Sequence, residues 1–298
     1  MNMKIKNVKT ASREEIKALQ AVELNILNQL KDVLEKHGLR FFLLGGTMIG
    51  AVRNGGFVPW DDDVDVIMFR DDYELFFKNQ EEWLKDTDLV LVRSNAEVSQ
   101  HTTGMNLKDK TTTFINKHSV RENIQHSIGI DINPLDFRPV GKFKQCQQAL
   151  YAAIFSLYNA NRLPDHQGKL LRVASAIPLK VFSEKAKSKI WQYFEKKMVS
   201  LSDPKSGEIV ELGVGPKALK RHLSAELFDE QKWVPFEKTL MPIPNGYDEY
   251  LSKVHGQYME LPPFEGQVAK HQTYLVDTEV PYSEKIRDEI LKELDNEA

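Results

Sequence analysis

The feature that most constrains this chain is a run of four aspartates within five residues, Asp61, Asp62, Asp63 and Asp65. The run follows a pair of glycines and leads directly into an apolar segment. Two like charges ~4 Å apart repel by roughly 4 kcal/mol at an effective dielectric constant near 20, so the run is unfavourable unless a cation lies beside it. A divalent metal ion is the simplest such cation. A metal held beside a glycine turn indicates a site that handles phosphate.

The composition is ordinary for a soluble globular protein. The 298 residues are 41% hydrophobic and 28% charged, and the net charge of −3 excludes a broadly basic nucleic-acid-binding protein. The single cysteine, Cys146, excludes an internal disulfide and fits a reducing compartment. The N-terminus lacks the apolar segment of a secretory signal, and no apolar run approaches the ~20 residues of a membrane-spanning helix. We therefore expect a cytoplasmic protein.

Apolar periodicity and turn residues predict a mixed sheet flanked by helices over residues 1–140. A helix is expected over residues 12–38, with Ser12 and Glu15 forming a capping box. A further helix is expected to be capped by Asp71 or Asp72. A short helix over residues 47–53 should open at the glycine pair. The expected strands cover residues 39–44, 63–69, 89–92, 105–108, 112–115 and 128–132, the last ending at Asn133-Pro134.

The second portion, residues 141–298, is expected to pack with the first as one unit, with a soft boundary near Gly141. Residues 143–200 should be mostly helical, and an acidic helix should follow Pro281. Residues 161–200 carry nine Lys or Arg against three acids, with apolar residues between them. This segment is either a solvated helix face or a membrane-surface element that reaches a lipid-linked acceptor at the inner face of the membrane.

The acidic run has a partner later in the chain. Asp61, Asp63 and Asp65 point the same way if their strand extends back that far. Asp131 lies between two isoleucines on an expected strand, where an unpaired carboxylate is costly. We therefore expect all four to share Mg²⁺ or Mn²⁺, which prefer oxygen ligands. The alternative is a solvated acidic loop, with Asp131 capping a turn.

Phosphate contacts are expected around this cluster. Gly45 and Gly46, between a strand and a helix, would let backbone N–H groups approach a phosphate. Arg53 could neutralise a second phosphate charge or form a surface salt bridge. Lys108 and His271 could contact phosphate or the acceptor, or could be a surface lysine and a histidine with an ordinary partner.

The motif Gly-Gly-Thr-x-x-Gly-Ala-x-Arg-x-x-Gly-Phe-x-Pro-Trp-Asp-Asp-Asp-x-Asp, from Gly45 to Asp65, closely resembles the LicD family. The segment from Ile130 to Asp136 looks like the next acidic motif of that family. Residues 244–263 are similar to its C-terminal motif, with His255 where the family usually has tyrosine. The resemblance spans roughly residues 20–275 and rests on a long, specific first motif.

The resemblance implies a nucleotidyltransferase-like fold of the α/β (α+β) class. It implies transfer of a phospho-alcohol from a CDP-activated donor onto a sugar hydroxyl. Bacterial members use CDP-choline to decorate teichoic acid or lipopolysaccharide with phosphocholine; relatives transfer glycerol or ribitol phosphate, as the animal fukutin-related proteins do with ribitol phosphate. Carried over by motif, the metal pair is Asp63 and Asp65, the third carboxylate is Asp131, and the phosphate-cradling turn is Gly45, Gly46 and Thr47.

The expected mechanism is in-line attack by a sugar hydroxyl, with Asp131 or Asp61 taking its proton. Two rivals remain open: nucleotidyl transfer to a small molecule or protein, and a non-catalytic binding protein on the same fold. Choline would need an aromatic cage. Its candidate residues, each at least as consistent with a core position, are Trp60, Trp233, Tyr247, Tyr258 and Phe264.

Overall fold

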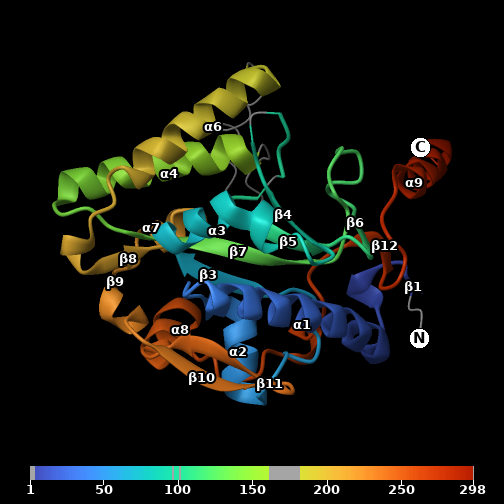
Figure 1. Ribbon diagram of the computed structural model, residues 1–298, viewed down its shortest axis with the longest axis horizontal. Helices are drawn as coiled ribbons and strands as arrows, with labels where there is room; N and C mark the ends of the chain where they lie inside the picture. The colour runs from blue at the N-terminus through green and yellow to red at the C-terminus, as the bar shows by residue number, and fades with distance from the viewer. Residues whose placement is uncertain (1–3, 96, 101, 161–181, 298) are drawn as a thin grey trace.

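The computed structural model describes residues 4–95, 97–100, 102–160 and 182–297. Its centre is a mixed sheet with the strand order β2-β3-β7-β5-β4, flanked by helices (Figure 1). β3 and β7 run parallel, and the other neighbours on this path are antiparallel. The mixed α/β sheet expected from the sequence is therefore confirmed. Its strands are β2 (Phe42–Leu43), β3 (Asp65–Phe69), β4 (Leu89–Arg93), β5 (Met105–Asp109) and β7 (Gly129–Phe137).

The first helix, α1 (Arg13–Lys36), crosses one face of this sheet and contacts β5 and β7 (Figure 1). The predicted capping box is confirmed: Ser12 Oγ accepts a hydrogen bond from the Glu15 N–H at 3.3 Å, and Glu15 Oε2 accepts one from the Ser12 N–H at 2.7 Å. An apolar stripe of α1 is buried against the sheet, and Gln20 and Glu23 are buried with it. The helix therefore carries two polar side chains into the interior.

Three strands differ in extent from the expectation. The strand expected over residues 39–44 is only the two residues of β2, and β3 begins at Asp65 rather than Asp63. β7 does not end at Asn133-Pro134 but continues to Phe137. The pairing of β5 with β7 stops at Ile132, before Pro134. The proline, which has no N–H to donate, therefore interrupts no hydrogen bond between β7 and β5.

The helix after β3 begins two or three residues earlier than a cap at Asp71 or Asp72 would place it, so the predicted cap is wrong. In α3 (Arg70–Trp83) the N-cap position is Phe69, without a side-chain cap bond. Asp71 and Asp72 lie in the first turn, where carboxylates favour the positive end of the helix dipole. Arg70 instead turns inward and binds Asp136 of β7 with two hydrogen bonds, of 3.0 and 2.7 Å. Both side chains are buried, so this pair ties α3 to the sheet.

The C-terminal half joins the sheets of the N-terminal half. β8 (Glu208–Val210) pairs with the end of β7, and β12 (Thr273–Asp277) pairs with β1 (Lys4–Ile5) and β6 (Thr113–Asn116). The last helix, α9 (Glu284–Glu297), is the expected acidic helix after Pro281. Strands from the two sides of Gly141 therefore pair with one another. The division of the chain into two portions near Gly141 stays a prediction.

The remaining elements pack around this framework. α4 and α6 lie side by side above the sheet in the view of Figure 1, and β10 and β11 form a separate antiparallel pair. These elements are α2 (Gly45–Asn54), α4 (Lys142–Ala160), α6 (Glu184–Val199), α7 (Pro216–Leu219), α8 (Tyr247–His255), β9 (Leu223–Ser224), β10 (Gln231–Phe236), β11 (Thr239–Pro244) and the 3₁₀ turns Val8–Thr10, Pro204–Ser206, Ala225–Phe228 and Phe264–Gly266.

Within the described residues, no helix is both long and apolar enough to cross a membrane. Residues 161–181 of the basic segment lie outside the described residues, so the expected membrane-surface element stays a prediction. In the part of that segment within α6, Lys187 Nζ binds Glu184 Oε1 at 2.7 Å.

Candidate metal and phosphate site

The four aspartates of the run gather where β3 begins. The strand starts at Asp65, so it does not extend back far enough for alternation along one strand to align Asp61, Asp63 and Asp65. The loop before the strand gathers them instead: ligand oxygens of Asp61, Asp62 and Asp63 lie within 4.8 Å of one another. Asp65 adds a carboxylate at the strand start, beside Asp131, its register neighbour on β7. The four expected ligands thus come from one loop and two adjacent parallel strands.

Asp61 is buried against the start of α2. Its backbone carbonyl accepts a hydrogen bond from Gln20 Nε2 at 2.8 Å, which anchors the loop to α1. A Cβ atom built on Gly46 would lie 2.5 Å from Asp61 Oδ2, so only glycine leaves room for this carboxylate. Burial and the nearby Asp63 raise the pKa of Asp61 to about 7. Lys270 Nζ, 4.0 Å from Asp61 Oδ1, offsets part of this rise.

Asp65 and Asp131 are fixed by different neighbours. The Asp65 N–H donates to Thr47 Oγ1 at 3.0 Å, so the threonine hydroxyl positions the strand start. Asn106 Nδ2 donates to Asp131 Oδ1 at 2.7 Å. Burial and the mutual repulsion with Asp131 raise the pKa of Asp65 to about 8, and burial likewise raises the pKa of Asp131. Both carboxylates are therefore costly to ionise without a cation.

Asp62 was not among the predicted site residues. It binds the segment that contains Lys270 and His271. Its Oδ1 accepts the Lys270 N–H at 2.9 Å, and its Oδ2 accepts the His271 N–H at 3.1 Å and lies 3.2 Å from His271 Nδ1. Burial acts to raise the pKa of Asp62, but the His271 side chain and these bonds lower it overall. The same contact raises the pKa of His271 to about 9. Asp62 thus holds the segment containing Lys270 and His271 against the cluster.

Glu23 of α1, like Asp62 and Lys270, is a residue of the site that the sequence did not predict. It is 2% exposed, and burial together with the charges of Asp63 and its neighbours raises its pKa well above the usual range. Its Oε2 has no hydrogen-bond partner among the described residues. The available signal was its position: it stands four residues after Leu19 and four before Leu27, inside the apolar stripe of the helix.

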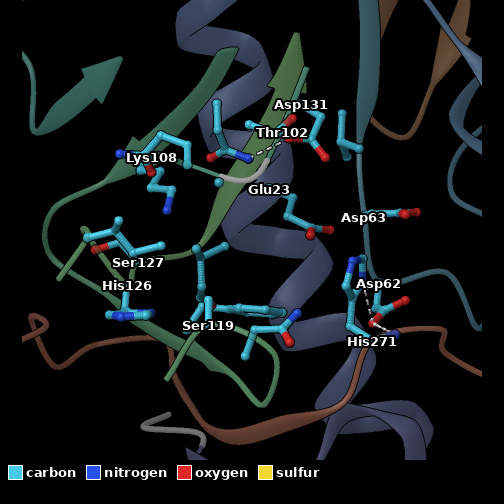
Figure 2. A pocket seen from close by; sticks show the side chains of 18 of the residues that line it. Glu23, Asp62, Asp63, Thr102, Lys108, Ser119, His126, Ser127, Asp131 and His271 are labelled. Carbon is cyan, nitrogen blue, oxygen red and sulfur yellow. Dashed lines mark hydrogen bonds and ion pairs between the residues drawn. The ribbon is translucent and has the colours of Figure 1, made fainter. Parts of the chain in front are cut away.

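A cavity of about 250 Å³ opens beside the cluster (Figure 2). Glu23, Asp63 and Asp131 line one side of it, and Lys108 and His126 lie across from them in Figure 2. Its other described lining groups are mainly hydroxyl, amide and imidazole side chains: Gln100, Thr102, Asn106, Asn116, His118, Ser119, Ser127 and His271. The cavity is therefore polar, with anionic and cationic ends.

The other predicted phosphate contacts divide into two groups. Lys108 lines the cavity, where its ammonium donates to the Gln125 carbonyl and burial lowers its pKa to about 8. His271 also lines it. Arg53 does not line the cavity: its Nη1 donates to the carbonyls of Tyr258 and Glu260 at 3.3 and 3.4 Å. Arg53 is thus bound to the loop after α8, and no acidic residue of the described chain forms an ion pair with it.

The donor set fits a hard divalent cation. All the convergent groups from the loop and strands are carboxylate oxygens, and one further buried carboxylate oxygen is unpartnered. Oxygen-only sets of this kind suit Mg²⁺ or Mn²⁺ rather than Zn²⁺. The acidic cluster can therefore hold a metal ion.

Comparison with known proteins places this site in a family. Residues 38–133 match the model described as LicD/FKTN/FKRP, nucleotidyltransferase domain. This part of the chain matches the nucleotidyltransferase domain of the LicD/FKTN/FKRP family. The matched segment holds the glycine turn, the aspartate run and Asp131, whereas Glu23, Lys270 and His271 lie outside it.

Several proteins similar to this chain are named as transferases. The chain is 28% identical over 259 residues to the lipopolysaccharide cholinephosphotransferase LicD of Haemophilus influenzae, covering 85% of this chain and 94% of that relative. It is 48% identical over 40 residues to the ribitol 5-phosphate transferases FKRP of mouse and human, covering 13% of this chain and 8% of each relative. The names of these relatives all state a transferase activity.

Proposed function

We propose that this protein transfers a phospho-alcohol from a CDP-activated donor to a sugar hydroxyl of a cell-surface glycan precursor and releases CMP. The observation that carries the proposal is the convergence of Asp61, Asp63, Asp65 and Asp131 beside a polar cavity with Lys108 within it. The relatives named above support the reaction class, because the reactions that their names state both transfer a phosphorylated alcohol.

Asp63, Asp65 and Asp131, with Asp61, would hold Mg²⁺ or Mn²⁺. When bound, the ion would neutralise charge on the donor diphosphate and on the CMP leaving group. Lys270 lies at the exposed side of the cluster, 71% exposed at its side chain, and can meet an incoming anionic donor. Asp62 fixes the backbone that carries it. The chain itself therefore supplies both the carboxylates and a cation for the phosphates.

The transfer would proceed in line. The sugar oxygen forms a bond to the β-phosphorus, the bond from that phosphorus to the CMP oxygen breaks, and CMP leaves with the electron pair. Either Asp131 or Asp61 would take the proton of the attacking hydroxyl. Asp131 is the better placed, because it lines the cavity and Asp61 does not. Asn106, bound to Asp131 Oδ1, would keep that carboxylate oriented.

The candidates for the transferred alcohol fall into two classes, choline and the polyols glycerol and ribitol. Phosphocholine is favoured by the Haemophilus relative, which covers most of the chain. A glycerol or ribitol phosphate is favoured by the cavity, because Phe114 is the one phenylalanine, tyrosine or tryptophan among its described lining residues. Trp60 and Phe264 line a separate small cavity. The remaining cage candidates, Trp233, Tyr247 and Tyr258, do not line the cavity at the cluster.

Release of CMP tests the proposal. Purified protein with Mg²⁺ would be given CDP-choline, CDP-glycerol or CDP-ribitol, each with and without an acceptor glycan preparation. The proposal expects metal-dependent CMP from one donor, abolished in Asp65→Asn, and the active donor identifies the alcohol. No CMP from any donor in the presence of acceptor would contradict it. CMP attached to an acceptor would instead establish nucleotidyl transfer.

A further inference from the structure

Glu23 is an unusual residue for the buried face of a helix. Its side chain projects from α1 into the cavity, between Asp131 and His271 in the view of Figure 2. It is almost fully buried, and Oε2 has no partner among the described residues. No Lys or Arg of the described chain forms an ion pair with it, and His271 is paired with Asp62 instead. A buried, unpaired carboxylate is among the costliest groups a fold can hold.

Anchoring of the helix does not account for Glu23. Gln20, one turn earlier on α1, already binds the acidic loop through Val58 O at 3.1 Å and Asp61 O at 2.8 Å. No hydrogen bond of this kind joins the Glu23 side chain to the described residues. Its strongest charge interactions are repulsive ones with Asp63, Asp62, Asp61 and Asp131. A buried carboxylate whose strongest charge interactions are all repulsive is explained by a cation that joins it to these neighbours.

We infer that Glu23 is a fifth carboxylate of the cation site, contacting the bound ion directly or through a water molecule on that ion. Mg²⁺ and Mn²⁺ sites commonly retain water, so a carboxylate can belong to such a site at either distance. The inference rests on the proposed metal dependence and extends the site to α1, outside the matched family domain of residues 38–133. α1 would then supply one carboxylate on the side of the cation that faces the cavity. The loop before β3, together with β3 and β7, would supply the other carboxylates.

Binding of Mn²⁺ to the metal-stripped full-length protein, measured by isothermal titration calorimetry, tests this inference without turnover. The variant is Glu23→Gln, which keeps size and removes the charge. Glu35→Gln is the matched control, because Glu35 is on the same helix, exposed, and loses the same charge. We expect Mn²⁺ affinity to fall by about tenfold or more in Glu23→Gln, which is the usual loss when a group that orients or supports metal ligands is removed. In Glu35→Gln the affinity should stay within about twofold of wild type.

A second readout separates a metal role from a packing role. Without Mn²⁺, Glu23→Gln should melt at a higher temperature than wild type, because glutamine removes the free-energy cost of either protonating this buried carboxyl group or burying its charge. With saturating Mn²⁺ the upward shift in melting temperature should be smaller in the variant than in wild type. A lower melting temperature without Mn²⁺ and an unchanged shift with it would show that Glu23 is a structural residue and would overturn the inference.

Two further variants keep the outcomes distinct. Glu23→Asp retains the charge but withdraws it by one methylene, so Mn²⁺ affinity should lie between wild type and Glu23→Gln; wild-type affinity in both variants contradicts the inference. Asp63→Asn should lose Mn²⁺ binding. If Asp63→Asn loses binding and Glu23→Gln does not, only the role of Glu23 fails. If wild type itself binds no Mn²⁺, the proposed metal dependence fails with it.

Discussion

Gly46 and Asp61 stand so close that a Cβ atom on Gly46 would meet Asp61 Oδ2 at 2.5 Å. The absence of a side chain at Gly46 therefore makes room for the Asp61 carboxylate, whereas its expected role was to make room for a phosphate. It lets an acidic loop rest on the first turn of α2, where backbone N–H groups and the positive helix end favour an anion. The resemblance to the family assigns this glycine to a phosphate turn, and the structure adds a carboxylate at the same turn.

Gly46→Ala should displace the Asp61 carboxylate and reduce transferase activity by about tenfold or more. The physical reason is steric, because the added methyl group occupies the place of Oδ2. CMP release measures the effect. Gly266→Ala is the control, since its added methyl would come no closer than 3.5 Å to Pro262 Cβ. Wild-type activity in Gly46→Ala would show that the position of Asp61 is not critical.

Removing divalent cations should make stability depend steeply on pH. Folding raises the pKa of Asp61 to about 7 and of Asp65 to about 8, so their contribution is fully favourable below about pH 4 and is lost as the pH rises through 7 and 8. The EDTA-treated protein should therefore be less resistant to urea at pH 8.5 than at pH 6. Added Mn²⁺ should restore resistance mainly at the higher pH. A flat profile without metal would contradict this electrostatic picture.

The pair of His271 and Asp62 predicts a second pH effect. Asp62 raises the pKa of His271 to about 9, so the stabilisation from the charged imidazole is fully present below about pH 6.5 and is lost as the pH rises through 9. In Asp62→Asn the pKa of His271 should fall toward its ordinary value. NMR titration of the His271 ring measures it directly, with the exposed His222 as an internal reference. An unchanged His271 pKa would mean that the pair does not form in solution.

Asp136 should behave differently from Asp131, although both lie in the second acidic motif. Asp136 is fully buried in a two-bond pair with Arg70. Asp136→Asn should destabilise the fold by about 3–5 kcal/mol, the usual cost of breaking a buried ion pair. Asp131→Asn should cost little stability and should remove Mn²⁺ binding. Urea unfolding and calorimetry on the two variants together check this, and equal effects on both properties would refute the division of roles.

Local signals in the sequence predict much of this site. The capping box at Ser12 defines the start of α1, and the spacing of apolar residues defines the helix. The aspartate run and the isolated Asp131 indicate that the two strands share a site, and Asp65 and Asp131 are indeed register neighbours. These features depend on residues near one another in the chain or on the cost of a lone buried charge.

The remaining contacts depend on long-range packing. Asp62 binds a segment 208 residues away at Lys270, and no local pattern marks that pairing. Arg53 lies in the last turn of α2, whose C-terminal end is close to the loop after α8, so its guanidinium binds carbonyls there rather than the cluster. Glu23 had a signal, a charge within an apolar stripe, but its meaning depends on which sheet face the helix covers.

The mass of the modified acceptor tests the central claim most directly. Wild type and Asp65→Asn would be incubated with Mg²⁺, the active CDP donor and the acceptor glycan, and the glycan would be analysed by mass spectrometry. The proposed function predicts a gain equal to one phospho-alcohol with wild type and no gain with the variant. A gain equal to CMP, or the same gain in Asp65→Asn, would contradict it.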